Sequence, residues 1–195
     1  MKKIFVYTGE GAYQARDIEG FLNVFDIEYE RLCEHDLSRL SGKGIFIVPG
    51  GAISAYLPAW GDSGKESIRD FVQDGGTYVG ICAGSYVAGT SFKGEKGLQF
   101  FDAELAYLRQ QQIIEAQDTK HRSISLITEN GPDFSPITGD IILKDNEGKS
   151  QAVRLACGSG SVYLFASHPE GSLYYRAYPQ DFTGAKWFVE FLSNL

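Results

Sequence analysis

Short apolar runs alternate with amphipathic segments over the first half of the chain. Ile4–Tyr7 and Gly44–Val48 are continuously apolar, which is typical of strands buried on both faces of a parallel sheet. Between them, apolar residues at helical spacing predict a helix from about Ala12 to Phe25, and the alternation in Ile27–Glu30 predicts a short strand. The pattern therefore predicts an α/β fold with a doubly wound sheet, whose ligands bind at the carboxyl ends of the strands.

The next segments continue this alternation up to about residue 90. Ser54–Gly64 contains one proline and two glycines and is predicted as a loop. Ile68, Phe71 and Val72 mark a helix that ends at Gly75, and Thr77–Ile81 is predicted as the strand that follows it.

Beyond Gly89 the pattern changes to short segments separated by turn residues. Periodicity leaves Glu104–Gln117 open between a helix and an extended segment. A helix is predicted over Phe182–Leu195, and four strands are predicted before it: Ser123–Thr128, Ile137–Leu143, Gln151–Ala156 and Ser161–Ala166. Because no linker or internal repeat interrupts the chain, we expect residues 1–195 to form a single domain.

The segment Thr77–Gly89, with the sequence TYVGICAGSYVAG, has the features of a nucleophile elbow. In such a turn between a strand and a helix, glycines two residues before and after the nucleophile give backbone clearance, and Gly80 and Gly84 flank Cys82 at this spacing. The amide groups that begin the following helix favour the thiolate, which is the attacking form. The alternative is a buried cysteine at the end of a strand, which is common.

A second glycine-rich turn, Pro49–Gly51, follows the third predicted strand. It can present backbone N–H groups at the same edge of the sheet as Cys82, where a ligand can bind. A plain turn is the alternative.

Composition and charge narrow the classes of partner and site. The chain has 195 residues, of which 43% are hydrophobic and 22% charged, and a net charge of −7. Since nucleic acids and anionic membranes bind basic surfaces, neither partner is expected, and a small molecule or a protein is favoured. Cys33, Cys82 and Cys157 are widely spaced, so we expect no disulfide framework, no metal site and no cofactor, and reduced thiols in a cytoplasmic protein.

Only one of the three histidines follows a strong strand pattern. His168 and Glu170 flank a proline, which restricts the backbone and can hold the carboxylate beside the imidazole. A thiol nucleophile needs such a base and a third group that orients it. His35 and His121 lie in polar surroundings and are interpreted as surface residues.

The order Cys, His, Glu, with one residue between the last two, resembles the class I glutamine amidotransferase superfamily. Five segments more closely resemble the amidotransferase-like domain at the N-terminus of eukaryotic biotin–protein ligases: residues 48–52, 61–64, 68–72, 75–86 and 167–170. This resemblance implies a flavodoxin-like, three-layer α/β/α sandwich with a mostly parallel sheet. It implies Cys82 as nucleophile, His168 as base and Glu170 as orienting acid, with an oxyanion hole at the backbone N–H groups of Gly51 and Ala83.

Three functions remain open from the sequence. The first is a cysteine hydrolase or amidotransferase-like enzyme that acts on a small amide, with Gly50, Tyr56 and Tyr86 at its substrate pocket. The second is a binding or regulatory module, in which Tyr13 and Trp60 join these tyrosines around a recognition pocket. The third is the protease and deglycase branch of the superfamily, in which a carboxylate after the first strand, here Glu10, approaches the thiol. No segment resembles the ligase catalytic domain, so biotinylation by this chain alone is not expected.

Overall fold

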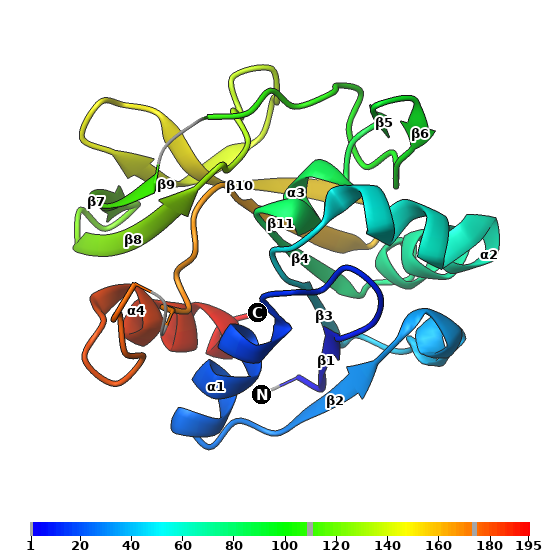
Figure 1. The fold of residues 1–195 in the computed structure, drawn as a ribbon, viewed down its shortest axis with the longest axis horizontal. Coiled ribbons are helices and arrows are strands. Elements are labelled where there is room, and N and C mark those ends of the chain that lie inside the picture. Colours follow the sequence, from blue (N-terminus) through cyan, green and yellow to red (C-terminus); the bar gives the residue numbers. More distant parts are fainter. Residues whose placement is uncertain (1, 109–110, 173–174) are drawn as a thin grey trace.

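The computed structural model describes residues 2–108, 111–172 and 175–195 (Figure 1). Its main feature, within these ranges, is a nine-stranded sheet with the order β2-β1-β3-β4-β11-β10-β9-β7-β8. The strands of this sheet are β1 (Ile4–Tyr7), β2 (Tyr29–Leu32), β3 (Ile45–Val48), β4 (Thr77–Ile81), β7 (Gln111–Asp118), β8 (Ser123–Glu129), β9 (Asp140–Asp145), β10 (Ser150–Cys157) and β11 (Gly160–Phe165).

The strands β2, β1, β3, β4 and β11 are parallel neighbours. The first four belong to the segment up to residue 90 that was predicted as a doubly wound sheet, and β11 joins them from the second half of the chain. Every residue of β1, β3 and β4 is buried, because helices cover both faces of the sheet. The second strand was placed two residues too early: Ile27 packs into the core from the turn after the first helix, and its N–H donates to Leu22 O. The apolar side chain of Ile27 is therefore buried as part of the turn, and the strand begins at Tyr29.

The other half of the sheet is an antiparallel extension made of β10, β9, β7 and β8. Since these pairings alternate, β10 and β7 run opposite to the remaining strands of the sheet. The uncertain segment 104–117 is partly extended, with β7 beginning at Gln111, while residues 109–110 lie outside the described ranges. Before it, β5 (Ser91–Phe92) and β6 (Glu95–Lys96) form a small separate hairpin.

Two hydrophobic cores lie on opposite faces of the sheet and make three layers. One contains residues from α1 (Ala15–Val24) and α4 (Thr183–Ser193), which lie on the same side of the sheet in Figure 1. The other contains residues from the 3₁₀ helix η1 (Glu34–Arg39), α2 (Ile53–Gln73) and α3 (Ala83–Tyr86). The α/β/α sandwich expected from the sequence is therefore confirmed.

The prediction of a loop over Ser54–Gly64 is wrong, because α2 already begins at Ile53. Tyr56, Leu57 and Trp60 are buried, and their spacing places them on one helical face against the core. Gly61 has φ 56° and ψ −170°, so it interrupts the helix at the point where the sequence suggested irregular structure. Burial of the apolar side chains outweighs the breaking tendency of Pro58 in this segment.

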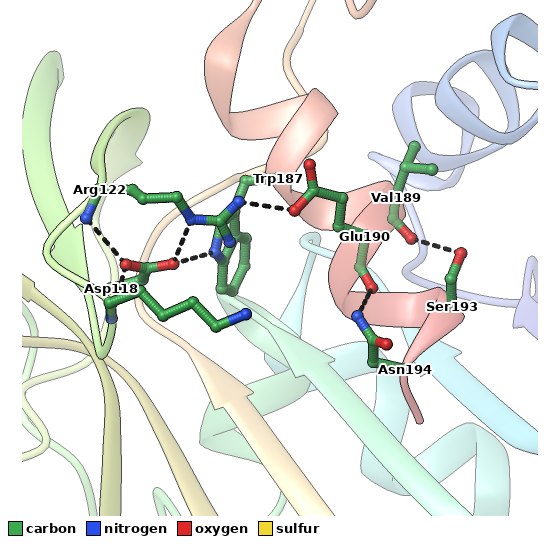
Figure 2. Close-up of polar contacts among 8 residues, drawn as sticks. Asp118, Arg122, Trp187, Val189, Glu190, Ser193 and Asn194 are labelled. Carbon is green, nitrogen blue, oxygen red and sulfur yellow. Dashed lines mark hydrogen bonds and ion pairs between the residues drawn. The ribbon is translucent and has the colours of Figure 1, made fainter.

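A polar cluster of buried Asp118 and Trp187 with exposed Arg122 and Glu190 attaches α4 to the turn between β7 and β8 (Figure 2). Asp118 accepts hydrogen bonds from Arg122 Nε at 2.8 Å and from Trp187 Nε1 at 3.2 Å, and Arg122 also pairs with Glu190 at 2.6 Å. Burial alone would raise the pKa of Asp118, but these bonds and two from backbone N–H groups lower it. The cluster therefore fixes the antiparallel extension against the helical layer. None of the helices in the described ranges is long and apolar enough to span a membrane.

Candidate active site

Cys82 lies at the sharp turn between β4 and α3, with φ 49° and ψ −104°. This conformation is costly for a residue with a side chain and is often found at functional sites. A Cβ atom on Gly80 would lie 2.6 Å from Gly84 O, and one on Gly84 would overlap Val48 O. The two flanking glycines are thus required by close backbone approach, as in a nucleophile elbow. Because α3 is a single turn, its dipole contributes less at the sulfur than a long helix would.

His168 and Glu170 form a buried pair in the loop after β11. Imidazole Nδ1 lies 2.9 Å from the Glu170 carboxylate, and the residues are 2% and 1% exposed. Two backbone hydrogen bonds join His168 to Ile127 of β8, with N–O distances of 2.7 and 3.4 Å. The edge strand of the antiparallel extension therefore holds the backbone of His168 in place.

The charges around His168 favour its protonated form. Burial by itself would lower the pKa of the imidazole, but the Glu170 carboxylate and then the neighbouring Cys82 sulfur raise it well above the usual 6.5. His168 Nε2 is buried and has no hydrogen-bond partner among the described residues. Cys82 Sγ instead donates to Glu129 O at 3.5 Å. The thiol is thus close to His168 but directed toward a backbone carbonyl.

The turn at Gly50 and Gly51 lies beside this group and is held from two sides. Tyr56 Oη lies 3.0 Å from Pro49 O and 3.2 Å from Gly50 O, and Gln14 N donates to Gly50 O at 3.1 Å. A Cβ atom on Gly50 would lie 2.8 Å from His168 Cε1, so the turn directly contacts the imidazole. No backbone hydrogen bond of the described chain uses the Gly51 N–H.

A cavity of about 680 Å³ opens beside the sulfur. Cys82, Ala83 and Gly51 line it together, so the two backbone groups expected to form an oxyanion hole adjoin the same space as the thiol. The N–H of Ala83, at the first position of a helix, has no intrahelical acceptor. The other lining residues are Tyr13, Gln14, Ala52, Ile53, Ser54, Tyr86, Phe92, Lys93, Tyr107, Glu129 and Asn130.

The aromatic residues expected at a pocket divide into two groups. Tyr13 and Tyr86 line the cavity. Tyr56 and Trp60 do not: they are buried, stack on each other with ring centroids 5.5 Å apart, and pack behind the glycine turn. Tyr56 thus supports the turn from the core. Gly50 also lies behind the surface of the cavity.

Glu10 is exposed on the turn after β1 and is absent from the cavity lining. Its backbone N–H donates to Glu34 Oε2 at 3.1 Å, and its carbonyl accepts from Tyr7 Oη at 3.2 Å. The geometry thus gives no contact between this carboxylate and the thiol. Across the described ranges, His, Cys, Asp and Glu side chains form no group of three or more that could hold a metal ion.

Several cavity residues were not expected from the sequence. Phe92 and Lys93 belong to the hairpin of β5 and β6, and Tyr107 belongs to the segment left open between a helix and an extended segment. Glu129 and Asn130 follow the predicted strand Ser123–Thr128. The positive φ of Asn130, 52°, fits the turn signal of that residue, but nothing local in the sequence indicates its approach to Cys82.

The fold belongs to the class I glutamine amidotransferase-like type. A solved structure described as a glutamine amidotransferase superposes with a TM-score of 0.76 over 98% of this chain and 99% of that chain, at 17% identity. PurLQS from Thermotoga maritima superposes with a TM-score of 0.72 over 100% of this chain and 99% of that chain, at 16% identity.

Residues 38–106 match the family model described as "Biotin-protein ligase, N terminal", which confirms the resemblance seen in the sequence. A curated biotin–protein ligase from Schizosaccharomyces pombe is 23% identical over 87% of this chain. The chain spans 33% of the length of that ligase.

Proposed function

We propose that the protein is a cysteine-dependent hydrolase or acyl-transfer enzyme that acts on a small amide. In this proposal Cys82 is the nucleophile, His168 the general base and acid, and Glu170 the group that orients His168. The observation that carries the proposal is the strained backbone of Cys82 beside a buried His168–Glu170 pair, in which His168 Nδ1 lies 2.9 Å from Glu170 Oε1. Such strain and such a buried charged pair are both costly, and they are typical of sites that use them.

The reaction would proceed in two steps. The Cys82 thiolate attacks the amide carbon and forms a C–S bond, and the oxyanion accepts hydrogen bonds from the N–H groups of Gly51 and Ala83. Protonated His168 then donates its proton to the leaving amine as the C–N bond breaks. Water, deprotonated by His168, attacks the thioester, and the C–S bond breaks to release a carboxylic acid.

Covalent labelling tests the proposal directly. Intact-protein and peptide mass spectrometry after incubation with a diazoketone analogue of glutamine should locate one adduct at Cys82. The Cys82→Ser variant should lose the adduct, whereas Cys33→Ser and Cys157→Ser should retain it. Absence of an adduct in the wild type, or equal labelling of the three cysteines, would rule the proposal out.

A second candidate is a binding or regulatory module without turnover, associated with a function of the biotin–protein ligase type. It is favoured by the hydrogen bond from Cys82 Sγ to Glu129 O, because this bond directs the sulfur toward a backbone carbonyl and away from the proposed base His168. Here the Cys82→Ser variant should retain wild-type ligand affinity and wild-type cellular function. Loss of function in a folded Cys82→Ser variant would contradict this candidate.

A further inference from the structure

One wall of the cavity beside Cys82 consists of aromatic rings. Tyr86 packs on Tyr107 with ring centroids 4.8 Å apart, and Phe92 lies 6.0 Å from Tyr86 and 6.2 Å from Tyr107. These three residues, here called the aromatic wall, all line the cavity. Burial raises the pKa values of Tyr86 and Tyr107, and the Cys82 sulfur raises both further, so both tyrosines are neutral phenols next to the thiol.

The mouth of the cavity is also aromatic. Tyr13 is 73% exposed and Tyr107 is 46% exposed, and they are two of the few large hydrophobic side chains of the described chain that solvent reaches so freely. Tyr13 comes from the loop before α1, whereas Tyr107 comes from the segment before β7. Exposed aromatic residues from separate segments around one cavity are typical of a ligand site.

The charged residues that line the cavity differ in their freedom to bind a ligand. Among the described lining residues Lys93 is the one basic side chain, and its Nζ lies 5.5 Å from the centroid of the Phe92 ring. Glu129, the one acidic residue there, accepts a hydrogen bond from Gln111 Nε2 at 3.1 Å. The carboxylate is therefore already engaged, while the Lys93 ammonium is exposed at the edge of the aromatic wall. The local positive charge of Lys93 favours a negatively charged ligand group at that edge.

We propose that the substrate of this site is an acyl amide that carries both an aromatic ring and a carboxylate. The ring packs on the aromatic wall, and the carboxylate pairs with Lys93. The reaction of this substrate rests on the proposed function of Cys82, whereas the selectivity for a ring and a carboxylate rests only on the cavity. A short aliphatic amide would leave most of a cavity of about 680 Å³ unfilled and the ring faces uncovered.

Equilibrium binding to the full-length Cys82→Ser variant tests this selectivity without turnover. Three ligands separate the two features: benzoylglycine has both, benzoylglycinamide lacks the carboxylate, and butyrylglycine lacks the ring. Ligand-observed NMR titration should rank benzoylglycine first. Offset or edge-to-face ring packing predicts about a threefold to tenfold advantage over butyrylglycine, and an exposed ion pair about a twofold to fivefold advantage over benzoylglycinamide.

Variants then assign each advantage to a residue. Lys93→Gln should remove the preference for benzoylglycine over benzoylglycinamide, and Tyr107→Leu should remove the preference over butyrylglycine. Lys96→Gln is the matched control, because Lys96 is exposed on the same hairpin but lies outside the cavity lining. It should change none of the three affinities.

The proposal is overturned if benzoylglycine binds no tighter than the other two ligands, if none of the three binds, or if Lys93→Gln weakens all three equally. Failure of the proposed function gives a different result. In that case neither the diazoketone analogue of glutamine nor the diazoketone made from benzoylglycine modifies wild-type Cys82, while the ligand ranking and its loss in the variants persist.

Discussion

Replacing Glu170 with Gln removes a negative charge 2.9 Å from the His168 imidazole while keeping a side chain of nearly the same shape. In the variant, the His168 imidazolium has no other carboxylate bonded to it among the described residues. Because the imidazolium is buried, water does not replace the lost carboxylate. Removal of one partner of a buried ion pair costs about 3–5 kcal/mol. Burial then lowers the pKa of the His168 imidazole without the Glu170 charge that otherwise raises it, so the neutral form gains.

The assay is the rate at which iodoacetamide carbamidomethylates Cys82, followed by peptide mass spectrometry between pH 6 and pH 9. Loss of the imidazolium removes the charge that stabilises the thiolate, so the rate at pH 7 should fall at least about tenfold in Glu170→Gln. Histidine NMR signals report the charge of His168 directly, and the exposed His35 and His121 serve as internal references. Glu66→Gln, an exposed substitution on α2, should leave the profile unchanged.

Stability supplies an independent check with a defined sign. A folded-state pKa raised above the usual 6.5 means that the ion pair stabilises the fold fully below that pH and less as pH rises through the folded value. Glu170→Gln should therefore lose more unfolding free energy at pH 6 than at pH 9. The reasoning is refuted if the variant reacts at the wild-type rate and its His168 signal still reports an imidazolium at pH 7.

Three further substitutions test the supports of the site by urea denaturation. Gly84→Ala should destabilise the protein by roughly 2–4 kcal/mol because its Cβ would overlap Val48 O. The control is Gly20→Ala, in open space on α1, which should stabilise the protein by about 0.5–1 kcal/mol. Equal effects of the two substitutions would contradict the close packing of the elbow. Asp118→Asn should cost roughly 1–3 kcal/mol at pH 7. Since the folded pKa of Asp118 is lowered, that difference should shrink as pH falls below about 3.8, and a difference that grows would contradict the assignment. Tyr56→Phe should lower the unfolding free energy by about 1 kcal/mol, because it loses the hydrogen bonds from Tyr56 Oη to the glycine turn. The same variant should slow labelling of Cys82 by the glutamine analogue. Unchanged labelling would show that the position of the turn does not affect the reaction.

The parallel half of the fold was predictable because its signals are local. Apolar runs give β1, β3 and β4 almost to the residue, and the spacing of Gly80 and Gly84 indicates the turn at Cys82 without knowledge of its neighbours. The segment Ser54–Gly64 was misread because one proline and its glycines suggested a loop, while the burial that makes it helical depends on the packed core.

The cavity wall was not predictable because it is formed by contacts between distant residues. Cys82 bonds to a residue 47 positions away, and Tyr86 Oη donates to Asn130 O across 44 positions. Neither Glu129 nor Asn130 carries a sequence pattern that distinguishes it from an ordinary residue at the end of a strand. Only the pairing of β7 and β8, which extends the sheet past β11, brings them to the thiol.

The antiparallel extension therefore has a role in the site as well as in the core. Its edge strand β8 bonds to the backbone of His168 through Ile127 and ends at Glu129, whose carbonyl accepts the hydrogen bond from Cys82. The same strand thus fixes the proposed base and contacts the proposed nucleophile. A shift of β8 would change both the distance from Cys82 to His168 and the bond that holds the thiol away from it. The position of Cys82 relative to Glu129 O and His168 is therefore coupled to the packing of β8, which α4 holds through a hydrogen bond of 2.8 Å from Ser125 N to Thr183 Oγ1.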